Sequence, residues 1–213
     1  MTKQGLVLIG AGGHARVVLD IVRQAARYDI IGLLDRNPAL HGTSLDGVPV
    51  LGGDDRIEVL RQQGVAHALV AIGDNETRCR LAAGLTARGF SLATAIHPKA
   101  IVAPDVSVGA GTVVMAGVVV NPGASIGENA IINTGATVDH DCTIGACAHI
   151  APGVHLGGGV RVGRLTLVGI GASVIQYKTI GCNVVVGTGA AVIHDVPDNV
   201  LVVGVPARVV RQK

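Results

Sequence analysis

The sequence is poor in aromatic residues and carries almost no net charge. It contains no Trp, two Tyr and one Phe among 213 residues, and its 17 Lys and Arg against 15 Asp and Glu give a formal charge of +2. A protein that binds nucleic acid generally needs a basic field, and often aromatic rings on which bases can stack. Since the sequence offers neither, we expect no nucleic-acid partner.

Long apolar runs and paired cysteines are also missing. Near the start, the run Leu6–Ile9 stops at Gly10, which is too short for a signal peptide or a membrane span. The four cysteines form no C-x-x-C pair and no zinc-binding spacing; they are Cys79, Cys142, Cys147 and Cys182. We therefore expect a protein of the reducing cytoplasm without a membrane span, whose cysteines are small core or surface residues.

Aliphatic residues and glycine are abundant instead, and both recur with a fixed period. An aliphatic residue occupies every sixth position without a gap from Val102 to Val192. A helix cannot give this period, and simple two-residue alternation would not single out every third inward position. The series is Val102, Val108, Val114, Val120, Ile126, Ile132, Val138, Ile144, Ile150, Leu156, Val162, Val168, Val174, Ile180, Val186 and Val192.

A longer period overlies the first one. Glycine follows the aliphatic residue once in every 18 residues, at Gly109, Gly127, Gly145, Gly163 and Gly181, so three six-residue units make one turn of a coil. The position two before each aliphatic residue is mostly small, which fits a tight corner. Short strands stacked at the ~4.8 Å spacing of hydrogen-bonded neighbours therefore account for the second half of the chain.

This repeat resembles that of the hexapeptide-repeat acyltransferases, whose units wind into a left-handed parallel β-helix. The segment Gly204–Arg208 also looks like the closing segment of that family. The resemblance implies a homotrimer with active sites between neighbouring subunits, and a prism with flat, Val-rich faces is itself prone to self-association. For the repeat taken alone, a β-helix without catalytic activity remains open.

The first part of the chain follows a different pattern, in which short apolar runs alternate with helical stretches. We expect strands near residues 6–9, 30–34, 48–51, 68–72 and 93–96, and helices near residues 15–27, 54–63 and 76–88. This order predicts a small parallel α/β sheet. The chain is thus expected to join an α/β domain, residues 1–97, to an all-β domain, residues 98–213.

The turn after the first expected strand has the form G-x-G-x-x-A, from Gly10 to Ala15, and Asp35 ends the next strand. Such a turn at a helix N-terminus can hold phosphate with backbone N–H groups. A tight turn that needs positive φ explains the same glycines equally well. An NAD-dependent reductase would use a similar turn, but this chain has a β-helix in place of a domain for a hydride acceptor.

A Rossmann-like domain with a G-x-G-G-H turn, joined directly to hexapeptide coils, resembles one branch of the family. This branch holds bacterial nucleotide-sugar N-acetyltransferases and proteins similar to sialic-acid O-acetyltransferases. The resemblance implies that the first domain binds the nucleotide-sugar. Gly12, Gly13 and His14 would contact the phosphates, Asp35 the ribose or base of the nucleotide, and Gly73 the edge of the nucleotide. Arg36, next to Asp35, is expected to be a further substrate-binding residue. Some relatives carry two acids where this chain has Asp35–Arg36, so the base stays open.

His140 is the strongest candidate for the chemical step. It follows Val138 by two residues and lies between Asp139 and Asp141, whose carboxylates can orient an imidazole and raise its basicity. A corner built from small residues has no packing need for an imidazole. By resemblance, His140 matches the family's general base and Asp141 its supporting acid.

His149 lies half a coil further on, so we expect it on a different face, where only a neighbouring subunit could bring it to His140. The resemblance implies acetyl-CoA contacts at His149, Gly158, Ile170 and Thr188, and a sugar contact at Asn133. In this arrangement an amine attacks the thioester, His140 takes the proton, and a donor near His149 stabilises the oxyanion. The chemistry needs acetyl-CoA and no metal.

We therefore expect an acetyl-CoA-dependent N-acetyltransferase of polysaccharide biosynthesis, acting on a nucleotide-linked amino sugar that the resemblance makes a 4-amino-4,6-dideoxy sugar. Three alternatives stay open. The first is O-acetylation of a sialic acid or another sugar hydroxyl with the same base. The second is a zinc-dependent β-helix hydratase that resembles the γ-type carbonic anhydrases and uses His149 and His155 as ligands, although their spacing matches that family poorly. The third is a non-catalytic scaffold that binds sugar nucleotides.

Overall fold

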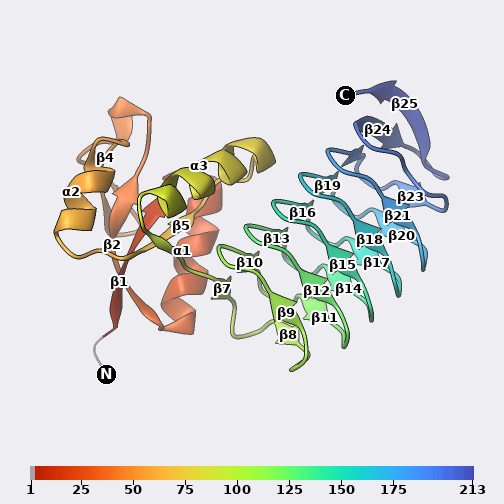
Figure 1. Ribbon diagram of the computed structural model, residues 1–213, viewed down its shortest axis with the longest axis horizontal. Coiled ribbons are helices and arrows are strands. Elements are labelled where there is room, and N and C mark those ends of the chain that lie inside the picture. Colours follow the sequence, from red (N-terminus) through yellow and green to blue (C-terminus); the bar gives the residue numbers. More distant parts are fainter. Residues whose placement is uncertain (1–2) are drawn as a thin grey trace. The chain divides into compact units, whose positions relative to one another are not determined.

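The computed structural model describes residues 3–213, and its contacts divide the chain into two compact units, Met1–Ile96 and His97–Lys213 (Figure 1). The first unit is built on one six-stranded sheet with the order β3-β4-β2-β1-β5-β6. Its strands are β1 (Gln4–Ile9), β2 (Tyr28–Leu34), β3 (Ser44–Leu45), β4 (Val48–Gly52), β5 (His67–Val70) and β6 (Ser91–Leu92). Its helices are α1 (Gly13–Ala25), α2 (Arg56–Gln62) and α3 (Asn75–Ala87), with a short 3-10 turn, η1 (Pro38–Leu40).

The sheet of the first unit is parallel except at one edge. β3 and β4 pair antiparallel across the turn Asp46–Gly47, where both residues have positive φ. An Asp-Gly pair with this backbone is a favoured two-residue hairpin turn. The prediction of an all-parallel sheet is therefore wrong at this edge. The strand expected at residues 93–96 is also different, since β6 ends at Leu92 and β7 (Ala95–Ile96) does not join this sheet.

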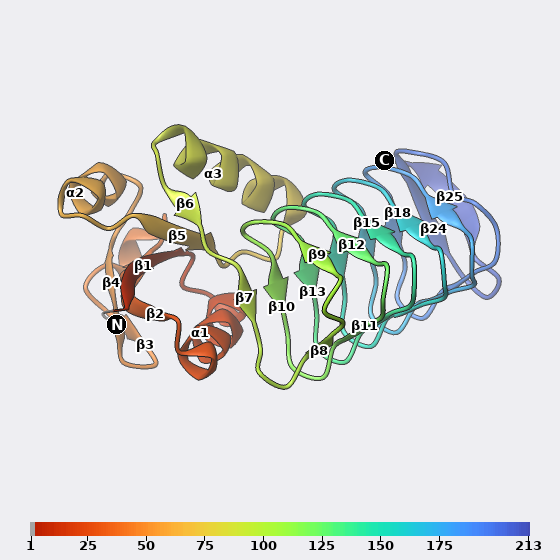
Figure 2. The ribbon, with the colours of Figure 1, turned by 60° about the horizontal axis from the view of Figure 1, so that its bottom comes forward.

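The second unit is a parallel β-helix, which confirms the expected fold class (Figure 2). Every strand of the repeat is two residues long and ends on a member of the six-residue aliphatic series. The strands are β8 (Ile101–Val102), β9 (Ser107–Val108), β10 (Val113–Val114), β11 (Val119–Val120), β12 (Ser125–Ile126), β13 (Ile131–Ile132), β14 (Thr137–Val138), β15 (Thr143–Ile144), β16 (His149–Ile150), β17 (His155–Leu156), β18 (Arg161–Val162), β19 (Leu167–Val168), β20 (Ser173–Val174), β21 (Thr179–Ile180), β22 (Val185–Val186) and β23 (Ala191–Val192).

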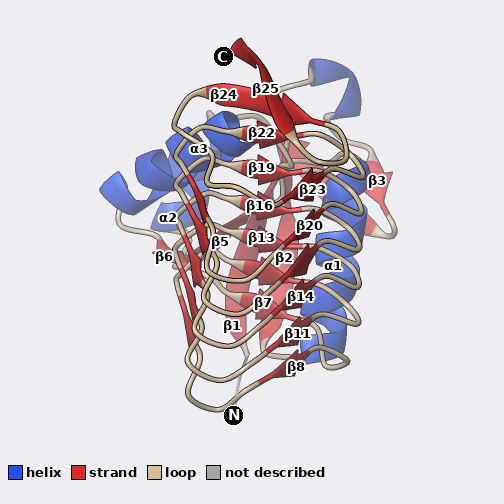
Figure 3. Cartoon of the chain, turned by 90° about the vertical axis from the view of Figure 1, so that its right-hand side faces the viewer, coloured by secondary structure: helices blue, strands red, loops and turns tan. Residues whose placement is uncertain are grey.

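Three flat faces form the coil, and Figure 3 shows their strands stacked in rows. Face 1 contains β10, β13, β16, β19 and β22, and continues into β24 (Val200–Val203) and β25 (Arg208–Gln212). Face 2 contains β8, β11, β14, β17, β20 and β23, and face 3 contains β9, β12, β15, β18 and β21. The chain therefore passes from face 1 to face 2 to face 3 in each coil. Paired residues are 18 apart, as in Val120 and Val138.

The 18-residue glycine period has a steric cause at the corner after face 3. A β-carbon built on Gly145 would lie 2.5 Å from the backbone nitrogen of Arg164 in the next coil. The other four glycines of this series meet the following coil just as closely. Only glycine lets the backbones of successive coils approach so far at this corner. Among the described residues, no helix is long and apolar enough to cross a bilayer.

Candidate active site

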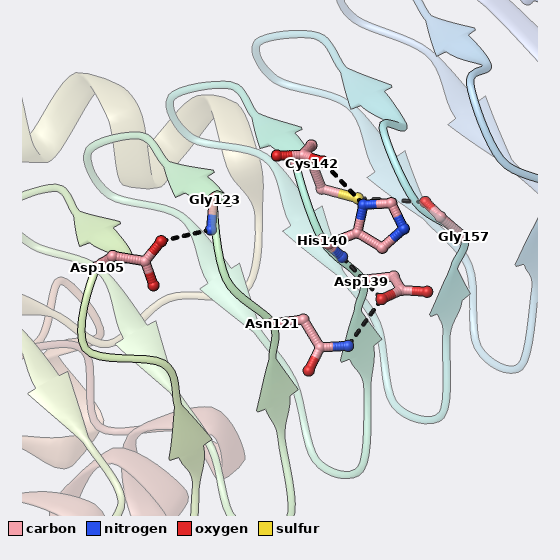
Figure 4. A network of polar contacts seen from close by, with 8 residues as sticks. Asp105, Asn121, Gly123, Asp139, His140, Cys142 and Gly157 are labelled. Atoms are coloured by element: carbon pink, nitrogen blue, oxygen red, sulfur yellow. Dashed lines mark hydrogen bonds and ion pairs between the residues drawn. The ribbon is translucent and has the colours of Figure 1, made fainter.

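His140 lies in the turn between face 2 and face 3 (Figure 4), and Asp141 follows it in the same turn. Nδ1 of His140 lies 2.8 Å from Oδ2 of Asp141, and the two side chains are 51% and 71% exposed. Asp141 has a φ of 59°, a left-handed conformation that Asp and Asn tolerate better than most residues. An acceptor at Nδ1 keeps the proton of the neutral ring there and leaves Nε2 as a base.

A second carboxylate supports the same histidine through the backbone. Oδ1 of Asp139 accepts from the backbone N–H of His140 at 2.8 Å and from the side-chain amide of Asn121 at 2.7 Å (Figure 4). The bond from Asn121 lowers the pKa of Asp139 most, followed by the bond from His140, so this carboxylate stays ionised. The pKa of His140 is raised above 6.5, chiefly by its hydrogen bond to Asp141 and then by the charges of Asp139 and Asp141.

Gly158 lies directly against the imidazole ring of His140. It occupies the same corner as His140 one coil later, and a β-carbon built on it would lie 2.5 Å from Nε2 of His140. The backbone N–H of the next residue, Gly159, donates to the carbonyl oxygen of His140 at 2.8 Å. The position predicted to contact acetyl-CoA therefore also gives the His140 ring its space.

His149 lies on β16 of face 1, away from the face 2 to face 3 corner that carries His140, as the half-coil spacing predicts. Nδ2 of Asn133 lies 3.0 Å from Nε2 of His149. Since an amide nitrogen only donates, Nε2 accepts, and the neutral ring carries its proton on Nδ1. Asn133, predicted to contact the sugar, thus also fixes the tautomer of His149.

Ile170 and Thr188 are stacked in the corner between face 1 and face 2. Both are exposed, Ile170 by 55%, and the N–H of Gly189 donates to the carbonyl oxygen of Ile170 at 2.8 Å. They therefore lie at a different corner from His140. The structure brings together His140 with Gly158, His149 with Asn133, and Ile170 with Thr188, but a single coil does not unite the three groups.

The glycines of the first turn divide into two kinds. Gly10 has a φ of 111°, and a β-carbon on it would lie 2.9 Å from the carbonyl oxygen of Ala71, so the fold itself requires glycine there. Gly12 and Gly13 have no positive φ, and β-carbons built on them would meet nothing within 4 Å. The turn explanation therefore accounts for Gly10 alone, while Gly12 and Gly13 expose bare backbone at the N-terminus of α1.

His14 is largely buried and neutral. Burial, and then the charge of Arg78, lower its pKa to about 4, and its Nε2 is buried without a hydrogen-bond partner. Arg78 is 1% exposed and donates to the carbonyl oxygens of Ile72 and Gly73 at 3.2 and 2.9 Å. Sequence reasoning missed Arg78, which fixes the loop that contains Gly73. His14 could donate a neutral hydrogen bond to a phosphate, but it does not add a positive charge.

Asp35 and Arg36 lie at the carboxyl end of β2 and line a cleft there. The carboxylate of Asp35 accepts from the backbone N–H groups of Ala11 and Asn37, both at 2.8 Å. It therefore connects the glycine turn, which contains Ala11, to the loop after β2, which contains Asp35 and Asn37. Arg36 pairs with Asp54 at 2.6 Å. The cleft lies at the carboxyl ends of β1, β2 and β5, which is where parallel sheets of this kind bind ligands.

The histidines that a zinc site would need lie on different sheets. His149 belongs to face 1, whereas His155 belongs to face 2, where its Nδ1 lies 2.9 Å from the hydroxyl of Thr137. Within residues 3–213 there is no group of three or more His, Cys, Asp or Glu side chains placed to hold a metal ion.

Comparison with known proteins gives matches for both units. Residues 5–85 match the PglD N-terminal domain family, and residues 123–158 match the bacterial transferase hexapeptide family. A mutant of perosamine N-acetyltransferase from Caulobacter crescentus, solved with CoA and GDP-perosamine, is 45% identical with a TM-score of 0.94, and the match covers 99% of each chain. The acetyltransferase domain of PglB from Neisseria gonorrhoeae FA1090 is 38% identical with a TM-score of 0.91, and the match covers 98% of this chain and 100% of that one. A second structure of that domain holds acetyl coenzyme A.

A curated relative, UDP-N-acetylbacillosamine N-acetyltransferase of Bacillus subtilis (strain 168), is 35% identical over 115 residues. That match spans 53% of this chain and only about half, 52%, of the relative. The solved structures match over nearly their whole length. The chain therefore belongs to the hexapeptide-repeat acyltransferases, in the branch of the nucleotide-sugar N-acetyltransferases.

Proposed function

We propose that this chain transfers the acetyl group of acetyl-CoA to the amine of a nucleotide-linked 4-amino-4,6-dideoxy sugar. The observation that carries the proposal is the pair His140–Asp141, a half-exposed imidazole held by a carboxylate at 2.8 Å on a coil of this family. A relative with the same architecture is named as a perosamine N-acetyltransferase, and the relative that matches 53% of this chain is named as a UDP-N-acetylbacillosamine N-acetyltransferase.

His140 acts as the general base. Its Nδ1–H donates to Asp141, so Nε2 is free to take a proton as the amine attacks the acetyl carbon. A C–N bond forms, the C–S bond breaks, and the amine proton passes through Nε2 to the departing thiolate. Asp141 and Asp139 favour the imidazolium that forms, as the raised pKa of His140 records.

His149 and the corner between face 1 and face 2 would receive acetyl-CoA, which supplies the thioester. The bond from Asn133 leaves Nδ1 of the neutral His149 ring as the donor. A donor of this kind can stabilise the negative charge that develops on the thioester oxygen. The exposed side chains of Ile170 and Thr188, stacked one coil apart, give the pantetheine arm an apolar and a polar contact.

The first unit would hold the nucleotide. Gly12 and Gly13 present unobstructed backbone at a helix N-terminus, which is the arrangement that binds phosphate. His14 would add a neutral donor, and Asp35, Arg36 and Gly73 lie in the loops that follow β2 and β5. Binding energy from the nucleotide, remote from the amine, would then help to orient the amine for attack.

A homotrimer would complete the site. Within one chain His140 and His149 belong to different parts of the coil, so a neighbouring subunit must supply one of them. The outward positions of face 1 include the half-buried Leu167 and Val185, whereas those of face 3 are polar, as at Thr143 and Arg161. The aliphatic face is the one expected to be covered on association. All four cysteines lie within the described residues and none forms a disulfide there, which fits the reducing cytoplasm, where we place the reaction.

A thiol-release assay tests the proposal. Purified protein is incubated with acetyl-CoA and with UDP-, GDP- or CMP-linked 4-amino sugars, and free CoA thiol is measured. We expect release with at least one of these sugars and an acetylated product that withstands mild alkali, because amides survive treatment that cleaves esters. An alkali-labile product would establish the O-acetyltransferase alternative. Tight binding of a nucleotide-sugar with no thiol release would leave only a binding scaffold.

A further inference from the structure

The strand-end cleft of the first unit continues into a second cleft between α2 and α3. The two clefts share Ile9, Arg36, Asp54 and Leu81. The first begins at Gly10 and Asp35, beside the glycine turn, and the second is lined further by Arg80 of α3 and by Arg88, the residue that follows α3. A ligand with its phosphates at the glycine turn would therefore extend along the Arg36–Asp54 pair into a cleft with an apolar floor and guanidinium groups on its rim.

The Arg36–Asp54 pair has open hydrogen-bonding capacity on both partners. Nε and Nη2 of Arg36 both donate to Oδ2 of Asp54, at 2.8 and 2.6 Å. Oδ1 of Asp54 and Nη1 of Arg36 have no partner among the described residues. The side chains are 40% and 58% exposed, so both remain accessible to a ligand. The pair thus presents one acceptor atom with room for two donors, next to one donor group.

Guanine is the standard base that matches this pattern. Its Watson–Crick edge presents two adjacent N–H donors, N1–H and the N2 amine, beside the carbonyl oxygen O6. Uracil offers a single N–H between two carbonyl oxygens, and cytosine and adenine offer one amine beside an unprotonated ring nitrogen. We propose that Asp54 and Arg36 read the base of the nucleotide-sugar: Asp54 accepts from N1–H and N2–H of guanine while Arg36 donates to O6. This inference rests on the proposed function and names the nucleotide of its substrate as a guanosine diphosphate.

Calorimetric titration of the full-length protein with free GDP, UDP and CDP tests the assignment without catalysis. A matched set of polar contacts to one base discriminates by roughly 10- to 100-fold, so we expect GDP to bind that much more tightly than UDP or CDP. Equal or tighter binding of UDP would overturn the assignment. In the thiol-release assay, transfer to a UDP-linked sugar together with weak GDP binding would reject guanine and leave the acetyltransferase proposal standing. Tight GDP binding with no transfer to any sugar would support the guanine assignment and reject the acetyltransferase proposal.

Asp54→Asn gives the sharpest variant, because an amide can donate where the carboxylate only accepts. We expect weaker binding of GDP and stronger binding of xanthosine diphosphate, whose base carries a carbonyl oxygen in place of the N2 amine. Asp55→Asn is the control, since it removes the same charge one residue along and Asp55 lines neither cleft. Arg36→Gln should weaken GDP binding without any gain for xanthosine diphosphate. Undiminished GDP preference in the Asp54→Asn protein would refute the proposal.

Discussion

The ring of His140 rests on Gly158, one coil further along, at a distance that leaves no room for a β-carbon between them. The built β-carbon would lie 2.5 Å from Nε2 and 2.6 Å from Cε1 of His140. Gly158 does not have a positive φ, so the backbone itself would accept alanine. The glycine therefore acts on the position of the imidazole rather than on the stability of the coil.

Gly158→Ala should displace the His140 ring and lower kcat/KM by about 10²-fold, since a shift of about 1 Å in a reacting group costs that much. The thermal midpoint should change little. The decisive measurement is a double-mutant cycle with His140→Ala. In the His140→Ala background the alanine at 158 should cause no further loss, because there is no ring to displace. Additive losses would show that Gly158 acts separately, for example through acetyl-CoA.

His140→Ala should lower kcat/KM by about 10²–10⁴-fold, or roughly 3–5 kcal/mol of transition-state stabilisation, if the imidazole is the general base. The melting temperature should hardly change, because the side chain is 51% exposed and leaves no core cavity. His155→Ala is the matched control, an exposed histidine of face 2 whose Nδ1 lies 2.9 Å from the hydroxyl of Thr137. Near-native turnover of the His140→Ala protein at neutral pH would contradict the assignment.

The pH profile of kcat/KM should show the influence of Asp141. The pKa of His140 is raised, so the base form is lost, and activity falls, as the pH drops through a value above 6.5. Asp141→Asn removes the largest cause of that shift, so the acid limb should move to lower pH while the plateau falls. Asn is the suitable replacement because it tolerates the left-handed backbone at this position. If the acid limb of the Asp141→Asn protein stayed in place, the limb would not report the titration of His140.

Much of the second unit could be predicted from the sequence, because the local geometry at each position of the repeat limits the residue type found there. The six-residue aliphatic series marks the strands, and the glycine after every third unit marks the corner where coils approach most closely. The spacing also placed His140 and His149 on different parts of the coil. The Asp46–Gly47 hairpin was missed, although this dipeptide is itself a turn signal.

The partners of the site residues could not be predicted from local pattern. Asn121 holds Asp139 from one coil away, and nothing near Asn121 in the sequence distinguishes it; only the 18-residue period brings the two together. Asp54 pairs with Arg36 because β2 and β4 are neighbouring strands that end at the same edge of the sheet, and the two residues follow these strand ends. The Asn121–Asp139 contact follows from the 18-residue register without any local signal, whereas the Arg36–Asp54 contact depends on strand order, which composition and periodicity leave undetermined.

Gly145→Ala should destabilise the coil, because the new β-carbon would meet the backbone of residues 163–164 rather than a movable side chain. Overpacking of this kind costs about 1–3 kcal/mol. Gly84→Ala in α3 is the control, since its β-carbon would meet only the end of the Arg88 side chain at 3.4 Å. Alanine is favoured over glycine inside a helix by up to about 1 kcal/mol, so the control should be neutral or stabilising. Urea unfolding of both variants measures the difference, and equal stability would disprove the steric cause of the 18-residue period.

Complementation between two inactive variants tests whether the site is shared between subunits. If each site takes His140 from one chain and His149 from its neighbour, any trimer that contains both His140→Ala and His149→Ala chains has one intact site. The two chains are co-expressed with different tags, purified through both tags, and assayed for thiol release beside each variant alone. Purification through both tags keeps only mixed trimers, and each of these has one intact site of three, so the purified protein should show about a third of the wild-type activity. Light scattering should give the mass of three chains. A trimer whose mixed form is no more active than the separate variants would mean that both histidines do not serve one intersubunit site.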